Sequence, residues 1–217
     1  MLIIKNKWLL AGFVLLPFFG SAQKRVGDLT LIYNSAIIIA QDSNKKISST
    51  TGFFVKGNLS RSEVNSNSFS SVTIYDSKNG SGVLLKEING QKLLIRMNEE
   101  NWSQKNKRYM NLNFTKTNET KTIAGYFCSQ AKASTPDGFE ITVFYTRDLI
   151  PENKYYDPTF KNLEGLPLEY DLTKGSMHIK YTLASINLNP VPASKFDFPT
   201  SGYRELTYEE SLKMKTQ

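Results

Sequence analysis

Segments that alternate with the two-residue period of β-strands, separated by tight-turn signals, occupy most of this sequence. In the clearest of them, residues 140–146 (EITVFYT), Ile141, Val143 and Tyr145 share one apolar face. The turn signals include SKNGSG, INGQK and STPDGF, and Asn-Gly pairs favour tight hairpins because both residues tolerate positive φ. The spacing of these turns predicts roughly nine to eleven strands joined by short hairpins, with few helices.

A sheet of so many strands does not stay flat, because the twist of its strands makes it curl. We therefore expect a mainly β protein with a single curved antiparallel sheet, a half-barrel, and few short helices. The concave face of such a sheet must be filled by side chains, a helix or a ligand. What the protein can bind therefore depends on what occupies that face.

Three segments lack the strand period. Residues 98–111 are polar and predict a loop or a short helix, and residues 207–215 predict a terminal helix capped by Thr207. The stretch PENKYYDPTFKNLEGLP contains three prolines and predicts a long connection over residues 151–166, with a short helical turn near residues 159–163. Connections of this length often serve as binding or lid segments.

The first 22 residues have the features of a cleavable signal peptide. Lys5 and Lys7 precede an apolar run over residues 8–19, and Gly20 and Ala22 offer the small side chains that signal peptidase admits. The run is shorter than the ~20 residues that a bilayer crossing needs, which disfavours a retained anchor. We expect cleavage after Ala22 and export, to the periplasm or alternatively to the cell surface or the extracellular space.

Residues 23–217 are expected to form a single β-rich exported domain, because this length suffices for one well-buried core. Loss of Lys5 and Lys7 lowers the formal net charge from +7 to +5. The densest basic stretch, QKNKRY at residues 104–109, lacks interleaved aromatic residues, so we expect a solvated loop and no nucleic-acid partner. The mildly basic surface is compatible with anionic lipid or polysaccharide, and with peripheral membrane contact.

The chain has one cysteine, Cys128, and therefore no internal disulfide framework. A nucleophilic cysteine needs a base, and the only histidine, His178, is 50 residues away, a distance that folding can still close. The strand-like surroundings of Cys128 favour packing as a small hydrophobe. One histidine and one cysteine also disfavour zinc. We expect no catalytic residue, no metal and no cofactor, and hence no enzyme.

A series of phrases in the second half of the chain resembles a known family. IAGYFC at residues 123–128, the strand ending YT, GLPLEY at 165–170 and FDFPTSGY at 196–203 follow in this order. The series resembles that of an exported family of unknown function found in Bacteroidota, which carries I-x-G-Y-x-C, G-L-P-L-E-Y and P-x-G-Y motifs. The family is similar in fold to the LolA-like carriers, which implies a curved half-barrel with an apolar hollow.

Two glycines in these phrases have a predicted backbone role. Gly125 is expected to allow a bend or a close backbone approach, and Gly165 an unusual backbone angle.

Two functions are compatible with this architecture. In the first, the concave face shelters an apolar ligand (a lipid or acyl group) or a hydrophobic partner segment. The residues expected to line such a site are Tyr126, Tyr145, Leu166, Leu168 and Tyr170. In the second, the protein fills its own hollow and acts as an envelope assembly or structural interaction protein through its outer surface. The leucines at 166 and 168 then only anchor a loop.

Overall fold

The computed structural model describes residues 23–39, 46–67 and 69–214. The predicted signal peptide, residues 1–22, lies outside the described residues. Among the residues described, no helix is both long enough and apolar enough to span a membrane.

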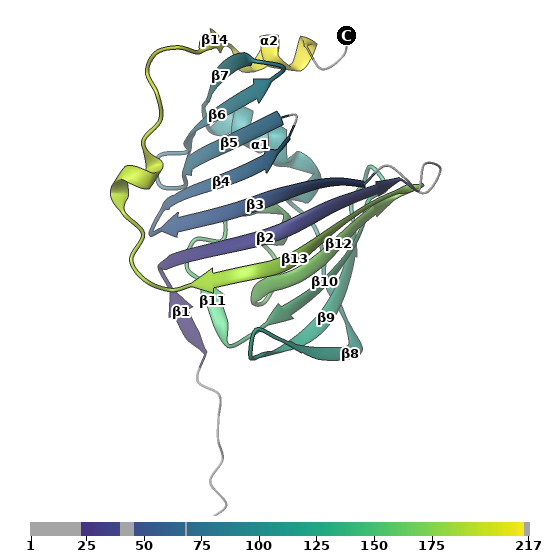
Figure 1. Cartoon of the computed structure of the whole chain (residues 1–217). Coiled ribbons are helices and arrows are strands. Elements are labelled where there is room, and N and C mark those ends of the chain that lie inside the picture. The colour runs from purple at the N-terminus through teal and green to yellow at the C-terminus, as the bar shows by residue number, and fades with distance from the viewer. Residues whose placement is uncertain (1–22, 40–45, 68, 215–217) are drawn as a thin grey trace, which may run out of the picture.

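Twelve strands form one large sheet (Figure 1). They are β2 (Asp28–Ile39), β3 (Lys46–Lys56), β4 (Leu59–Ser66), β5 (Phe69–Asp76), β6 (Ser81–Ile88), β7 (Gln91–Met97), β8 (Thr115–Ile123), β9 (Tyr126–Ser134), β10 (Glu140–Thr146), β12 (Leu166–Lys174), β13 (Met177–Asn187) and β14 (Arg204–Leu206). Their order is β14-β7-β6-β5-β4-β3-β2-β13-β12-β10-β9-β8, and only the short β14 pairs with its neighbour in parallel.

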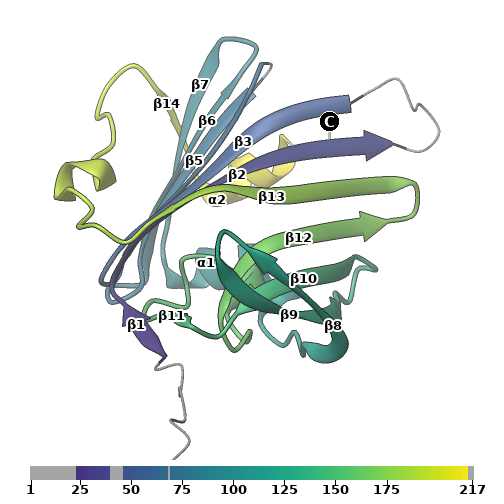
Figure 2. The same ribbon diagram turned by 60° about the horizontal axis from the view of Figure 1, so that its bottom comes forward.

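The sheet is curved and does not close, since β14 and β8 form its two edges. Figure 2 shows that the two halves of the sheet face different directions, with β2 and β13 at the bend between them. The predicted fold class, a mainly β half-barrel with few short helices, is confirmed. The strand number was underestimated, because β14 and the small parallel pair of β1 (Lys24–Val26) with β11 (Leu149–Pro151) are too short to show alternation.

The hairpins form where the sequence places turn residues. Asn89 and Gly90, the Asn-Gly pair of INGQK, both have positive φ, as that pair permits. Between β8 and β9, Ala124 (φ +50°) and Gly125 (φ +83°) make the turn. Nothing lies within 4 Å of the position of a Cβ at Gly125, so this glycine serves a bend and not a close approach.

The helices are short and begin at capped residues. In α1 (Glu99–Asn106), the Asn98 side chain accepts a 2.9 Å bond from the Asn101 amide, so the polar stretch predicted as a loop or short helix contains a helix. α2 (Tyr208–Lys213) is the predicted terminal helix, and Thr207 accepts a 3.1 Å bond from the Glu210 amide. The 3₁₀ turns are η1 (Lys107–Tyr109), η2 (Pro158–Phe160) and η3 (Ala193–Phe196).

Both faces of the β3–β7 half are covered. On the inner face, Trp102 of α1 stacks on Tyr75 of β5 with ring centroids 3.8 Å apart. On the outer face, the strap that follows β13 (residues 188–203) packs Val191 and Phe196 against Ile74. Apolar side chains therefore alternate to both sides of these strands, and neither face of this half is a free apolar surface.

Candidate binding surfaces

The concave face of the sheet carries a continuous aromatic cluster. Ring contacts run from Tyr156 to Phe53 (5.7 Å), from Phe53 to Tyr33 (6.0 Å) and from Tyr33 to Tyr170 (5.6 Å). Tyr170 also contacts Phe160 at 4.8 Å. These are edge-to-face arrangements, which are favourable for aromatic pairs. The rings of the concave face are therefore already in contact with aromatic partners from the same chain.

Two of these partners come from the predicted long connection. The inserted segment, residues 152–165, joins β11 to β12 and contributes Tyr156, Phe160 and Leu163 to the core of the hollow. Its 3₁₀ turn covers residues 158–160, close to the predicted helical turn. The segment thus fills the place that a ligand would need on this half of the sheet.

The five predicted ligand-binding residues lie together in this core. Tyr145 and Tyr170 are 6% and 5% exposed, Leu166 and Leu168 are fully buried, and Tyr126 is half-buried at the edge of the same cluster. The structure therefore places all five side chains in or beside one cluster. Their contacts in this structure are with the chain itself, and their role as ligand contacts stays a prediction.

The inserted segment also buries polar groups whose burial no sequence pattern indicates. The Asn153 Nδ2 and Tyr156 hydroxyl are buried and lack a hydrogen-bond partner. Burial raises the pKa of Asp157, although the Thr159 amide donates a 3.0 Å bond to its carboxylate. Burial also raises the pKa of the nearby Tyr181 to about 12, and the Asp157 charge adds to this shift. An Asp and an Asn in a proline-containing loop signal a turn in sequence, and nothing there indicates burial.

We expect Asp157→Asn to stabilise the protein at neutral pH. The folded state raises the pKa of this carboxyl, so its ionisation lowers stability as the pH rises from the unfolded-chain value of ~3.9 through the folded value. Asparagine removes the charge and keeps an oxygen for the Thr159 amide. The gain is about 1.4 kcal/mol for each unit by which the pKa is raised, measured as the free energy of unfolding in urea.

The gain should shrink as the pH is lowered toward the unfolded-chain pKa, where Asp157 is protonated in both states. Asp137→Asn is the matched control, because a hydrogen bond from Thr135 lowers the pKa of that exposed carboxyl, and its loss should not stabilise the protein. An Asp157→Asn variant that is less stable than the parent at neutral pH would contradict the buried-charge interpretation.

Cys128 and His178 lie in different environments. Cys128 on β9 is fully buried and donates to the Tyr126 carbonyl of its own strand at 3.4 Å. His178 on β13 lies 2.7 Å from the Asp171 carboxylate on β12. β9 and β13 are three strands apart in the sheet, or about 14 Å at the usual strand spacing. Cys128 occupies the core position that the sequence predicted.

Native Cys128 should resist alkylation. Burial raises the pKa of its thiol to about 11, so little thiolate is present and reagent access is closed. We expect iodoacetamide at about pH 8 to leave the folded protein unmodified and to add one group in guanidinium chloride, as measured by mass spectrometry. A Ser134→Cys variant supplies an exposed thiol on the same strand as a positive control. Rapid alkylation of folded wild-type protein would contradict this prediction.

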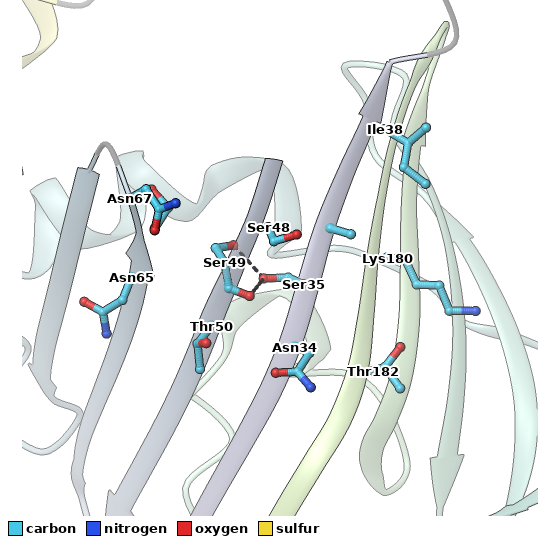
Figure 3. Close-up of a pocket in the computed structure, with 12 residues that line it drawn as sticks. Asn34, Ser35, Ile38, Ser48, Ser49, Thr50, Asn65, Asn67, Lys180 and Thr182 are labelled. Atoms are coloured by element: carbon cyan, nitrogen blue, oxygen red, sulfur yellow. Dashed lines mark hydrogen bonds between the residues drawn. The ribbon is translucent and has the colours of Figure 1, made fainter. Parts of the chain in front are cut away.

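The outer face of the sheet carries a polar groove of about 650 Å³ (Figure 3). Residues of β2, β3, β4 and β13 line it, among them Asn34, Thr50, Asn65 and Thr182. On β2, Asn34 alternates with the core residue Tyr33, so its side chain points away from the hollow. Beside it, the Ser35 hydroxyl of β2 and the Ser49 hydroxyl of β3 are hydrogen-bonded at 2.7 Å (Figure 3). Most of the side chains that line the groove are amides and hydroxyls, and Ala36, Ile38 and Lys180 lie beside them.

The basic stretch at residues 104–109, predicted as a loop, lies entirely in α1 and η1. Arg108 pairs with Asp137 at 3.0 Å, and the Lys105 ammonium lies 5.4 Å from the Trp102 ring centroid. Arg108 and Lys105 of this stretch therefore contact other side chains of the same protein. Among the residues that the structure describes, no group of three or more His, Cys, Asp or Glu side chains is arranged to hold a metal ion.

Comparisons with solved structures give matches with TM-scores below 0.5. No protein-family model matches the sequence, and no curated protein sequence does. PNGF-II is 18% identical with a TM-score of 0.49, and the match covers 85% of this chain and 33% of PNGF-II. An uncharacterised conserved protein from Thermus thermophilus is 6% identical with a TM-score of 0.49, over 82% of this chain and 90% of that one.

A β-barrel-like protein of a domain of unknown function from Brucella abortus is 7% identical with a TM-score of 0.42, over 76% of this chain and 99% of that one. With PNGF-II, in contrast, the chain spans only about a third of the length of the other protein. Likenesses with identities and TM-scores this low assign neither a family nor a function to this chain.

Proposed function

We propose that the protein is a non-enzymatic exported binding protein of the cell envelope that acts through its outer surface. The observation that supports this most strongly is the filling of the hollow. Tyr156 and Phe160 of the inserted segment and Trp102 of α1 cover the apolar inner face of the sheet. We propose that such a protein contacts its partners in the periplasm through polar outer surface, such as the groove that Asn34, Thr50 and Thr182 line.

The absence of enzymatic activity is part of the same proposal. Its support is the separation of Cys128, in the core, from His178, which is paired with Asp171 on the outer face. A nucleophile and its base need to be within hydrogen-bond reach of one another.

Lipid analysis of the purified protein tests this proposal. We expect mass spectrometry of solvent extracts to find no stoichiometric lipid, and the apolar probe N-phenyl-1-naphthylamine to show no saturable binding. One lipid or one probe molecule per protein would overturn the self-filled hollow and support the apolar-ligand function.

The apolar-ligand function is a second candidate, and one observation favours it. The inserted segment carries a buried carboxyl and two buried polar groups without partners. Each such group costs free energy, about 1–3 kcal/mol when it is unsatisfied. The segment is therefore held less firmly than an apolar one would be, and a ligand that displaced it would meet Tyr145, Leu166, Leu168 and Tyr170.

This second candidate predicts an inverse effect of Asp157→Asn. If a ligand must displace the segment, a variant that holds the segment more tightly should bind N-phenyl-1-naphthylamine more weakly than wild type does. Equal or absent binding in both proteins would argue against displacement.

A further inference from the structure

Two adjoining cavities form a groove beside the hairpin turns of the sheet. One of about 220 Å³ lies between the β5–β6 turn, α1 and the inserted segment, and one of about 750 Å³ continues past the β3–β4 turn. They share Ser77, Tyr155 and Lys161 as lining residues. We call the two together the hairpin groove. It is outside the aromatic cluster of the hollow and separate from the polar groove of Figure 3.

Aromatic side chains form part of its wall. Tyr155 is 37% exposed, the most exposed tyrosine among the large hydrophobic side chains described. Its ring is held by the Lys161 ammonium, 4.6 Å from the centroid. Deeper in the groove lies the parallel stack of Trp102 on Tyr75. An exposed ring that is fixed in place offers a flat apolar surface to a ligand with one apolar face.

Asparagine side chains supply oriented polar groups around this ring. The amide nitrogens of Asn79, Asn106 and Asn162 donate to Asp76, to the Trp102 carbonyl and to the Leu112 carbonyl, at 2.6, 2.9 and 3.0 Å. These bonds orient the amides and leave their oxygens as acceptors. Asn153, which also lines the groove, is 6% exposed and has an amide nitrogen without any partner.

The charges of the lining balance. Three lysines and three glutamates contribute to it: Lys78, Lys154, Lys161, Glu99, Glu152 and Glu164. A groove that selects an anion or a cation would carry an excess of the opposite sign. The balance favours a neutral ligand that is recognised by hydrogen bonds.

We propose that the hairpin groove is a binding site for a neutral carbohydrate. A sugar ring presents a face of C–H groups to an aromatic ring and hydroxyls at its rim to amides, which matches Tyr155 surrounded by asparagines. The proposal rests on the proposed function, because it assigns a ligand class to a surface groove outside the filled hollow.

Intrinsic fluorescence provides a direct readout. The sequence contains two tryptophans, Trp8 and Trp102, and Trp102 lines the groove. In the full chain carrying Trp8→Phe, Trp102 is the only tryptophan. We expect maltotriose, cellotriose or chitotriose to change its emission saturably, and a heparin hexasaccharide, as the anionic probe, to bind no better.

The variants Tyr155→Ala and Phe127→Ala make a matched pair. Both remove an exposed aromatic ring, and Phe127 is 63% exposed on β9, outside the groove lining. We expect Tyr155→Ala to weaken sugar binding roughly tenfold and Phe127→Ala to leave it unchanged. Circular dichroism and the Tm of both variants verify that they remain folded.

Three results would overturn the carbohydrate site: no saturable response to the neutral sugars, equal loss in both variants, or preference for the anionic probe. None of them affects the proposed function, which fails separately if the protein carries a stoichiometric lipid. A lipid-loaded protein that also binds sugar through Tyr155 would leave the groove standing and overturn the filled hollow.

Discussion

Replacing Gly165 with alanine should destabilise the protein by about 3 kcal/mol or more. A Cβ at this position would overlap the Thr146 carbonyl oxygen and approach Cδ2 of Tyr145 to 2.8 Å. The obstacle is backbone on one side and a buried ring on the other, so neither can move without displacing β10. Urea unfolding of the variant gives the loss, and low yield of folded protein is the extreme outcome.

Gly175→Ala is the control for the backbone effect of losing a glycine. Gly175 has φ +56° and nothing within 4 Å of its Cβ position, so its replacement should cost only the strain of that conformation, about 1–2 kcal/mol. A Gly165→Ala variant that is as stable as Gly175→Ala would show that the contact between the inserted segment and β10 is not tight.

Truncating Tyr170 should cost about 3–5 kcal/mol, the usual effect of removing a buried aromatic ring. Tyr170 contacts Tyr33, Phe160 and Tyr181, with ring centroids 5.6, 4.8 and 4.3 Å away. Tyr170→Ala therefore opens a cavity between the sheet and the inserted segment. The loss is measured as the change in the free energy of unfolding in urea.

Tyr170→Phe and Phe127→Ala are the controls. Phenylalanine keeps the ring contacts and should change stability by less than about 1.5 kcal/mol. Phe127 is exposed, and its truncation should stay within about 0.5 kcal/mol. Retained stability in Tyr170→Ala would indicate that the ring packs loosely and is free to meet a ligand, contrary to the packed core.

The fold was predictable from strand alternation and turn residues, because both depend on only a few neighbouring residues in the sequence. The face shared by Ile141, Val143 and Tyr145 is the buried face of β10, at 1%, 0% and 6% exposure. Asn89 and Gly90 adopt the positive φ that their turn needs. The curvature followed from strand number, since twist accumulates across a wide sheet.

The roles of the two motif glycines, Gly125 and Gly165, could not be predicted fully from neighbouring residues. Gly165 was predicted to need an unusual backbone angle, and that prediction is wrong, because Gly165 instead allows the Thr146 carbonyl to approach. Gly125 was predicted to allow a bend or a close approach, and only the bend is present. Sequence identifies a glycine, but the distance between segments far apart in the chain decides why glycine is required.

The sequence by itself determined the strands, the turns, the curled sheet and the apolar side of each strand, because these depend on neighbours along the chain. Only the tertiary structure decided what occupies the hollow. Residues 152–165 have no periodicity that predicts burial, yet Tyr156 and Phe160 enter the core because the sheet curves around them. The hairpin groove likewise brings together residues from β5, α1 and the inserted segment. No spacing in the sequence predicts that these residues lie close to one another.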